Sequence, residues 1–191
     1  MLRLLLLTLC LASLPALADT KLSFIGSVSS NTPDTGNLDT ASGDDKSEIG
    51  YGVGMRALMG ISEALFFRSG VGLVWKNFGY DVNVSGVKGR YDLSFIYFNV
   101  PLTLYWKASD RVGFFGGTAL NAKINSTCDE SGAVSSCSIK GRRSLVFPLI
   151  VGFDFNLSEV VGLELSYEHG ITETAKDLKV HSVVGSVLIH F

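Results

Sequence analysis

The chain has 191 residues, of which 47% are hydrophobic and 18% are charged, and its formal net charge is −2. The Lys and Arg residues are scattered, so the sequence lacks the basic stripe that nucleic-acid binding requires, and we expect no nucleic-acid partner. This length fits a single domain.

Residues 1–18 predict a secretory signal peptide. A single cation, Arg3, precedes the apolar run 4–14, and Ala16 and Ala18 form an A-x-A cleavage site. The alternative is a transmembrane anchor, but that would need roughly 20 apolar residues and this run is shorter. We therefore expect an exported protein whose mature part, 19–191, is one domain.

Two cysteines, Cys128 and Cys137, remain after the predicted signal peptide is removed with Cys10. They lie close together in a polar stretch without a nearby histidine. In an exported protein this spacing predicts a disulfide that closes a short loop. Two free thiols, or half of a metal site, are the alternatives.

Alternation of apolar and polar residues dominates the mature part, whereas helix-period signals are poor. The mature part has no apolar run long enough for a membrane helix, and the chain holds 21 glycines. The pattern predicts an all-β protein. Eight strands are expected near 21–28, 48–60, 65–76, 91–107, 111–124, 144–156, 160–169 and 179–191.

The connections between these strands alternate in length. Three short, similar turns contain Ser62–Glu63, Ser109–Asp110 and Ser158–Glu159. The other four are longer and polar, near 29–47, 77–90, 125–143 and 170–178. An antiparallel up-and-down meander produces this arrangement, with both termini on the short-turn side.

A sheet in lipid hides every backbone donor and acceptor only if it closes into a barrel. The strand near 91–107 carries one apolar face over the about 9–11 residues that span a bilayer. A membrane barrel turns such a face outward, whereas a soluble, lipocalin-like barrel would turn it inward. The length of the apolar sets favours the membrane barrel. In this strand the set is Phe98, Val100, Leu102, Leu104 and Trp106.

Charged residues stand on the opposite face of several strands. In a membrane barrel they would line the lumen, which in an eight-stranded barrel is narrow enough to be filled by side chains. We therefore predict a packed polar network of Arg–carboxylate pairs. Its members are Arg56, Arg68, Asp154, Glu164 and Glu168.

Aromatic residues cluster toward the strand ends, as expected for the two interfacial girdles of an outer-membrane barrel. The first group, toward the long loops, is Tyr51, Trp75, Phe78, Tyr91 and Phe95. The second group, toward the short turns, is Phe66, Phe67, Trp106, Phe155 and Phe191.

The last strand ends the sequence on GSVLIHF, with Ile189 and Phe191 on one apolar face. This ending resembles the C-terminal assembly signal of Gram-negative outer-membrane barrels. The resemblance implies that the barrel assembly machinery reads Ile189 and Phe191 during insertion.

The stretch YFNVPLTLYWKASDRVGFFGG, residues 97–117, resembles the outer-membrane protein β-barrel domain family that includes PorT-like proteins. The mature chain as a whole is similar in architecture to the small OmpA/OmpX-type barrels. The resemblance implies an eight-stranded antiparallel up-and-down transmembrane β-barrel in the bacterial outer membrane, surrounded by its lipid.

The histidines, His169, His181 and His190, do not suggest a catalytic site. Adjacent strand residues point to opposite faces, so His181 and Ser182 cannot act together, and His169 forms no obvious nucleophile–base set with Ser166 and Glu168. We expect no enzymatic activity, cofactor or metal.

The favoured hypothesis is a non-enzymatic barrel whose surface loops serve recognition, adhesion or envelope protection through an extracellular partner. The alternatives are a lipid-modifying enzyme, a narrow pore or small-ligand transporter, and a soluble periplasmic binding barrel.

Overall fold

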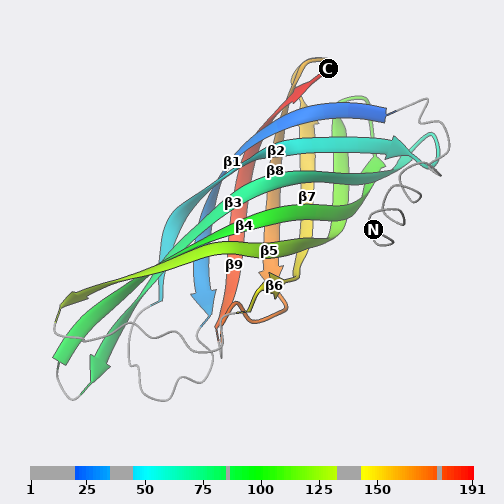
Figure 1. Ribbon diagram of the computed structural model, residues 1–191. Helices are drawn as coiled ribbons and strands as arrows, with labels where there is room; N and C mark the ends of the chain where they lie inside the picture. The colour runs from blue at the N-terminus through cyan, green and yellow to red at the C-terminus, as the bar shows by residue number, and fades with distance from the viewer. Residues whose placement is uncertain (1–19, 35–44, 85–86, 133–142, 176–177) are drawn as a thin grey trace, which may run out of the picture.

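The computed structural model describes residues 20–34, 45–84, 87–132, 143–175 and 178–191, which form an antiparallel β-sheet that curls into a barrel (Figure 1). The strands are β1 (Thr20–Asp34), β2 (Asp45–Gly60), β3 (Leu65–Val84), β4 (Val87–Lys107), β5 (Val112–Gly132), β6 (Leu145–Val146), β7 (Pro148–Asn156), β8 (Val161–Gly170) and β9 (Lys179–His190).

The barrel closes because the first strand pairs with the last. The register between β1 and β9 runs from Ser23↔His190 to Asp34↔Lys179. Eight strands form the ring, in the order β1-β2-β3-β4-β5-β7-β8-β9, and β6 adds two residues beside β5. This confirms the predicted eight-stranded up-and-down barrel. The described part of the chain contains no helix with the length and apolar composition that crossing a membrane requires.

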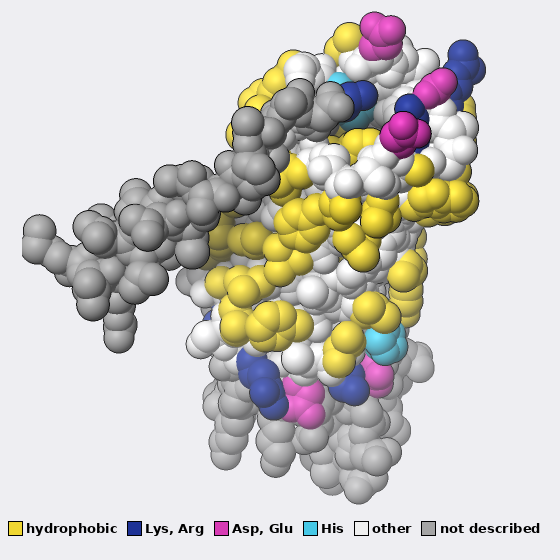
Figure 2. All heavy atoms as spheres, turned by 90° about the vertical axis from the view of Figure 1, so that its right-hand side faces the viewer, with side chains coloured by type: hydrophobic (Ala, Val, Ile, Leu, Met, Phe, Trp, Pro, Cys, Tyr) yellow, Lys and Arg dark blue, Asp and Glu magenta, His cyan; other side chains and the backbone are white. Residues whose placement is uncertain are grey.

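Side chains alternate between the outside of the barrel and its interior. On β4, Leu104 and Trp106 are 53% and 54% exposed, whereas Thr103 and Tyr105 are 1% and 5% exposed. Hydrophobic side chains cover the wall of the face seen in Figure 2, and charged side chains gather at its two ends. The apolar face is therefore on the outside, where lipid solvates it.

The region 77–90, predicted as a long polar loop, is instead the end of a hairpin. Strand β3 continues to Val84 and β4 begins at Val87. Cross-strand pairs hold the two strands together, Tyr80 opposite Tyr91 and Asp81 opposite Arg90. Polar composition suggested a loop because a hairpin outside the membrane needs no apolar face.

Other strand boundaries also differ from the prediction. Strand β1 extends to Asp34 and β5 to Gly132, well beyond the expected ends at 28 and 124. The strand predicted over 144–156 is divided into β6 and β7 on either side of Phe147.

The girdle assignment is wrong for four of the ten aromatic residues. Phe78 and Phe95 are fully buried and stack inside the barrel with ring centroids 5.5 Å apart. Phe66 lies against the inward-facing Tyr105, at 6.0 Å between centroids. Tyr91 lies 5.3 Å from Tyr80, which packs against the buried interior. All four are an even number of positions from an interior residue of their own strand, Lys76 or Tyr97, and therefore point to the same face. The alternation of side chains along a strand therefore predicts which way an aromatic side chain points better than its closeness to the strand end does.

Two apolar clusters fill parts of the barrel interior. The first, which we call the long-loop cluster, comprises Phe78, Leu93, Phe95, Tyr97, Val146, Ala175, Leu178 and Val180. The second, the short-turn cluster, comprises Tyr105, Phe115, Ala119 and Ile150. Polar side chains share the interior with both clusters.

Candidate functional site

The first candidate site is a sheet extension formed by β3, β4 and β5, which continue past the rest of the barrel at the long-loop end (Figure 1). Strand β5 pairs with β7 only as far as Thr118↔Leu149, and with β6 at Asn121 and Ala122. Its pairing with β4 continues to Gly89↔Gly132. Three strands therefore form a raised wall on one side of the barrel.

Ion pairs lie close to the tip of this extension, where Asp81 stands opposite Arg90. Arg90 contacts Asp92 and Glu48, each at 2.5 Å. Its hydrogen bond to Asp92, together with Glu48, raises the pKa of the Arg90 guanidinium above its ordinary value. Lys46 contacts Asp81 at 2.8 Å. Positive and negative side chains are thus paired within the extension and between it and β2, so the extension does not present a patch of one charge.

The long-loop cluster lies inside the barrel and shares Phe78, Leu93 and Phe95 with the strands of the extension. Phe95 also stacks on Tyr97, at 6.0 Å between centroids. These rings occupy the interior where a conducting pore would need water. The barrel interior is therefore obstructed at this end.

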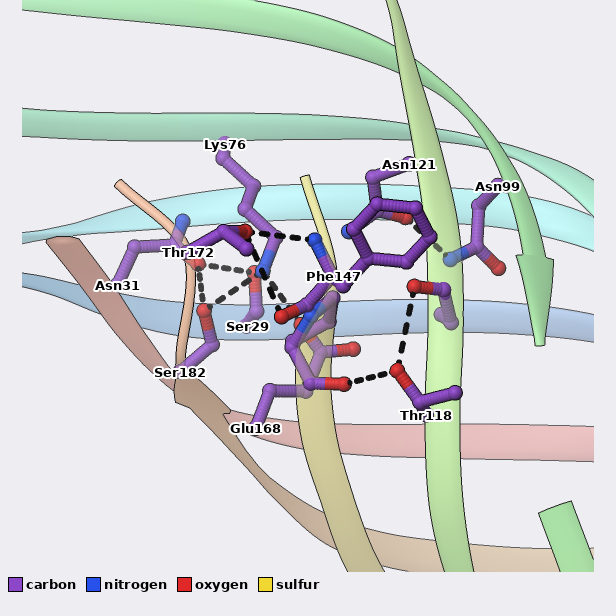
Figure 3. A network of polar contacts seen from close by, with 12 residues as sticks. Ser29, Asn31, Lys76, Asn99, Thr118, Asn121, Phe147, Glu168, Thr172 and Ser182 are labelled. Atoms are coloured by element: carbon purple, nitrogen blue, oxygen red, sulfur yellow. Dashed lines mark hydrogen bonds and ion pairs between the residues drawn. The ribbon is translucent and has the colours of Figure 1, made fainter. Parts of the chain in front are cut away.

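Below that cluster lies a polar network centred on Lys76 (Figure 3). The Lys76 ammonium forms a salt bridge with Glu168 and donates a hydrogen bond to Ser182 Oγ at 3.1 Å. Ser182 and Ser29 both donate to Asn31 Oδ1, at 2.8 and 3.1 Å. Four strands, β1, β3, β8 and β9, are thereby cross-linked through the interior.

A second polar group surrounds Arg68. Its guanidinium contacts Glu164 at 2.6 Å, donates to Thr103 Oγ1 at 3.2 Å and lies 3.6 Å from the centroid of the Phe115 ring. The side chains of Arg68 and Glu164 are only 5% and 2% exposed. Removing either side chain of such a buried pair lowers the stability of the fold, because the remaining charge is left uncompensated.

The other residues predicted for the lumen also face the interior. Asp154 accepts a hydrogen bond from Tyr105 Oη at 2.9 Å. Arg56 lines the same internal cavity, of about 40 Å³, as Arg68, Glu164 and Glu168. Among the described residues, Arg56 forms no hydrogen bond or salt bridge.

Sequence reasoning left several interior residues out of the predicted network, chiefly Lys76, Thr103, Tyr105 and Asn31. Lys76 is an even number of positions from Arg68 on β3, and Tyr105 is an even number of positions from Asn99 on β4. The alternation of side chains along each strand therefore could have placed both in the interior. Asn31 could not be found in this way, because its position was assigned to a loop.

At the short-turn end, His190 links two strands. Its Nδ1 lies 2.7 Å from Ser23 Oγ and its Nε2 lies 3.0 Å from Asn156 Oδ1. The chain of contacts has the order of a nucleophile, a base and an orienting group. However, Ser23 is only 6% exposed and lies near the short-turn end of its two ladders, opposite both Arg56 and His190.

The other two histidines lie on the outer wall. The rings of His169 and His181 are 4.6 Å apart, and both lie beside Tyr167. Ser166 and Ser182 are buried in the interior, on the other side of the wall. The described residues include no group of three or more His, Cys, Asp or Glu side chains suited to a metal ion.

Residues at the chain ends and loops were also predicted as functional. Phe191 is 63% exposed, its ring lies 4.9 Å from that of Phe24, and Ile189 is exposed on the same outer wall. Cys128 is half-buried and packs against the long-loop cluster. Cys137 and the predicted signal peptide lie outside the described residues.

Comparisons with known proteins agree with this architecture. Residues 4–191 match a family model described as outer membrane protein beta-barrel domain. A comparison with curated proteins finds no match.

Solved structures also match. Neisserial surface protein A is 15% identical, with a TM-score of 0.51 over 89% of this chain and 97% of that one. The attachment invasion locus protein of Yersinia pestis, Ail, is 14% identical, with a TM-score of 0.46 over 90% and 98%. At these identities the likeness concerns the fold alone.

Proposed function

Since the chain belongs to the outer membrane protein β-barrel domain family and is an integral protein of the bacterial outer membrane, we propose that it is a non-enzymatic surface protein. Its recognition surface is the β3–β5 extension together with the neighbouring loops, which meet an extracellular partner in adhesion or envelope protection. Barrels of this kind place short turns in the periplasm and long connections outside the cell.

The observation that carries this proposal is the inequality of the strands. Strands β3, β4 and β5 have 20, 21 and 21 residues, whereas β7 and β8 have 9 and 10. A bilayer requires only about 9–11 residues per strand. The surplus therefore serves something outside the membrane.

The orientation is tested with an epitope tag inserted between Val84 and Val87. We expect antibody to label intact cells that carry this tag. The matched control carries the tag between Ser158 and Glu159 and should be labelled only after the outer membrane is permeabilised. The reverse pattern would invert the proposed orientation.

The role in recognition is tested by shortening the hairpin, replacing 81–90 with a two-residue Asn-Gly turn. Cells expressing this variant should adhere less to host surfaces, or survive serum less well, than cells expressing the wild type at an equal level. The variant should still show a heat-dependent gel shift. Unchanged adhesion and survival would remove the extension from the function.

Two further roles belong to the same proposal. Ile189 and Phe191 serve the barrel assembly machinery, and a disulfide between Cys128 and Cys137 holds a surface loop. The second is tested by the mobility of the exported protein on a non-reducing gel, where reduction should change the band of the wild type but not of Cys137→Ser.

The lipid-modifying enzyme is disfavoured because the outer-wall histidines lie on the opposite side of the wall from Ser166 and Ser182. We expect lipid A from cells expressing His169→Ala or His181→Ala to have the same mass spectrum as lipid A from wild-type cells. A modification lost in either variant would restore the enzyme hypothesis.

A further inference from the structure

The periplasmic end of the barrel contains a cavity that the proposed recognition surface does not use. We call it the vestibule; its volume is about 660 Å³. Ligand pockets for small molecules usually have volumes of about 300–1,000 Å³. The vestibule is therefore large enough for a small organic molecule.

The vestibule narrows abruptly inside the barrel. Arg56 and Arg68 line both the vestibule and the next cavity, which has a volume of only about 40 Å³. Beyond it the long-loop cluster fills the interior. A molecule entering from the periplasm would thus stop at the two guanidinium groups.

These two guanidinium groups are not equivalent. Arg68 is charge-paired with Glu164, donates to Thr103 Oγ1 and lies over the Phe115 ring. Arg56 is partly buried and is attracted by the nearby charges of Glu164 and Glu168, but it forms no hydrogen bond or salt bridge with any other described residue. A guanidinium offers five N–H donors, and leaving a buried charge unpaired is costly. Arg56 therefore has donors available for a ligand.

The charges around the vestibule favour an anion. Five cationic side chains line it and three carboxylates, Asp110, Asp154 and Glu159, accompany them, while Glu164 neutralises Arg68 from inside the barrel, so positive charge still exceeds negative charge. Asp110 contacts Lys107 at 2.7 Å, and Asp154 accepts from Tyr105. The cations are Lys21, Arg56, Arg68, Lys107 and Arg111.

The side walls add an apolar requirement. Leu58, Phe66 and Leu188 line the vestibule from three strands, and Leu157 contributes from the turn between β7 and β8. Water in contact with these side chains is readily displaced by an apolar group. A ligand that satisfies both parts has a small apolar body and one anionic group.

From these features we propose that the vestibule binds a small periplasmic molecule that joins a carboxylate or phosphate to an apolar body. Its anionic group contacts the Arg56 guanidinium, Lys21 and Arg111 attract it at the rim, and its apolar part lies against Leu58 and Phe66. The extracellular extension takes no part in this binding.

The test uses the mature barrel in a non-ionic detergent and follows the Arg side-chain Nε–H resonances by NMR. Benzoate and phenyl phosphate should bind saturably and shift the Arg56 resonance, whereas benzyl alcohol, which lacks the charge, should not. The short-chain lipid dihexanoyl phosphatidylglycerol is tested as a further ligand. Binding of this lipid more tightly than phenyl phosphate would identify the source as a lipid headgroup, and weaker binding would identify it as a free solute.

The decisive variant is Arg56→Gln, which should weaken phenyl phosphate binding at least about tenfold, because it removes a charge-assisted hydrogen bond. Lys46→Gln, which removes a charge that contacts Asp81 of the extracellular extension, is the control and should bind as the wild type does. If Arg56→Gln fails to give a heat-shifted band, Arg111→Gln at the rim is used, with a smaller expected loss of about two- to threefold. Absence of saturable binding, or equal binding by wild type and the arginine variant, would overturn the proposal.

Discussion

At the scale of single residues, the Arg68–Glu164 pair makes the clearest prediction. Removing one partner by Glu164→Gln leaves a buried guanidinium without its counter-charge, so the free energy of unfolding should fall by about 3–5 kcal/mol. Urea titration of the barrel in micelles measures this change. Lys46→Gln breaks an exposed pair and should cost about 1 kcal/mol or less.

The pair is further tested by a double variant. If Arg68 and Glu164 act on each other, the loss in the Arg68→Gln, Glu164→Gln double variant should be smaller than the summed losses of the single variants. Additive losses would show that the two side chains contribute independently and would contradict the ion pair.

Gly70 makes a second prediction at this scale. A Cβ at this position would lie 2.1 Å from the Met55 carbonyl oxygen, which belongs to the backbone of the neighbouring strand and cannot move aside alone. Gly70→Ala should therefore lower the free energy of unfolding by about 1–3 kcal/mol. The control is Gly26→Ala, where a Cβ meets nothing within 4 Å. Equal stabilities for the two variants would refute the packing argument.

At the scale of the element, the final strand carries the assembly proposal. Phe191→Ser should reduce the amount of inserted, heat-shifted barrel in cells, because the assembly machinery loses the terminal aromatic side chain. Phe153→Ser removes a lipid-facing aromatic residue from β7, 44% exposed, and serves as the control. If both variants insert equally well, the terminus has no special role in assembly.

Strands inside the membrane were predictable, and those outside it were not. Lipid forces strict alternation, so β4 showed its apolar face in Phe98, Leu102 and Leu104. In the extension both faces meet water, and Asp81 and Arg90 therefore looked like loop residues although they stand opposite each other in a ladder. Whether a strand can be recognised from its sequence therefore depends on the solvent that each of its faces meets, lipid or water, and not on strand propensity.

The interior was predictable only in part, for a related reason. Parity places Arg68 and Glu164 inside, but their contact joins residues 96 positions apart and depends on the stagger of strands around the ring. Alternation along the strand also does not predict that Lys76 forms a salt bridge with Glu168 while Arg56 forms none with the described residues. Pairing across a barrel is a property of its closed geometry.

At the scale of the whole molecule, the filled interior predicts that the barrel does not conduct. The rings of Phe78, Phe95 and Tyr97 stack across the interior, and beneath them the salt bridges of Arg68 and Lys76 surround a cavity of about 40 Å³. Planar-bilayer recordings of the purified barrel should show no steady channel. Recordings of Phe95→Ala, which lacks one of the stacked rings, are the comparison. Stable openings in the wild type would contradict the filled interior.

The unequal heights of the strands make access to the cell surface directional. Strand β4 has 11 residues more than β8, which at about 3.3 Å per residue amounts to roughly 35 Å of additional sheet on one side. Within the described part of the chain, the outer mouth is bordered by short strands on the β7–β9 side, while from the opposite side a large molecule meets the outer surface of the tall sheet first. Neighbouring molecules in a crowded membrane would therefore differ in what they present to a partner according to how each is rotated.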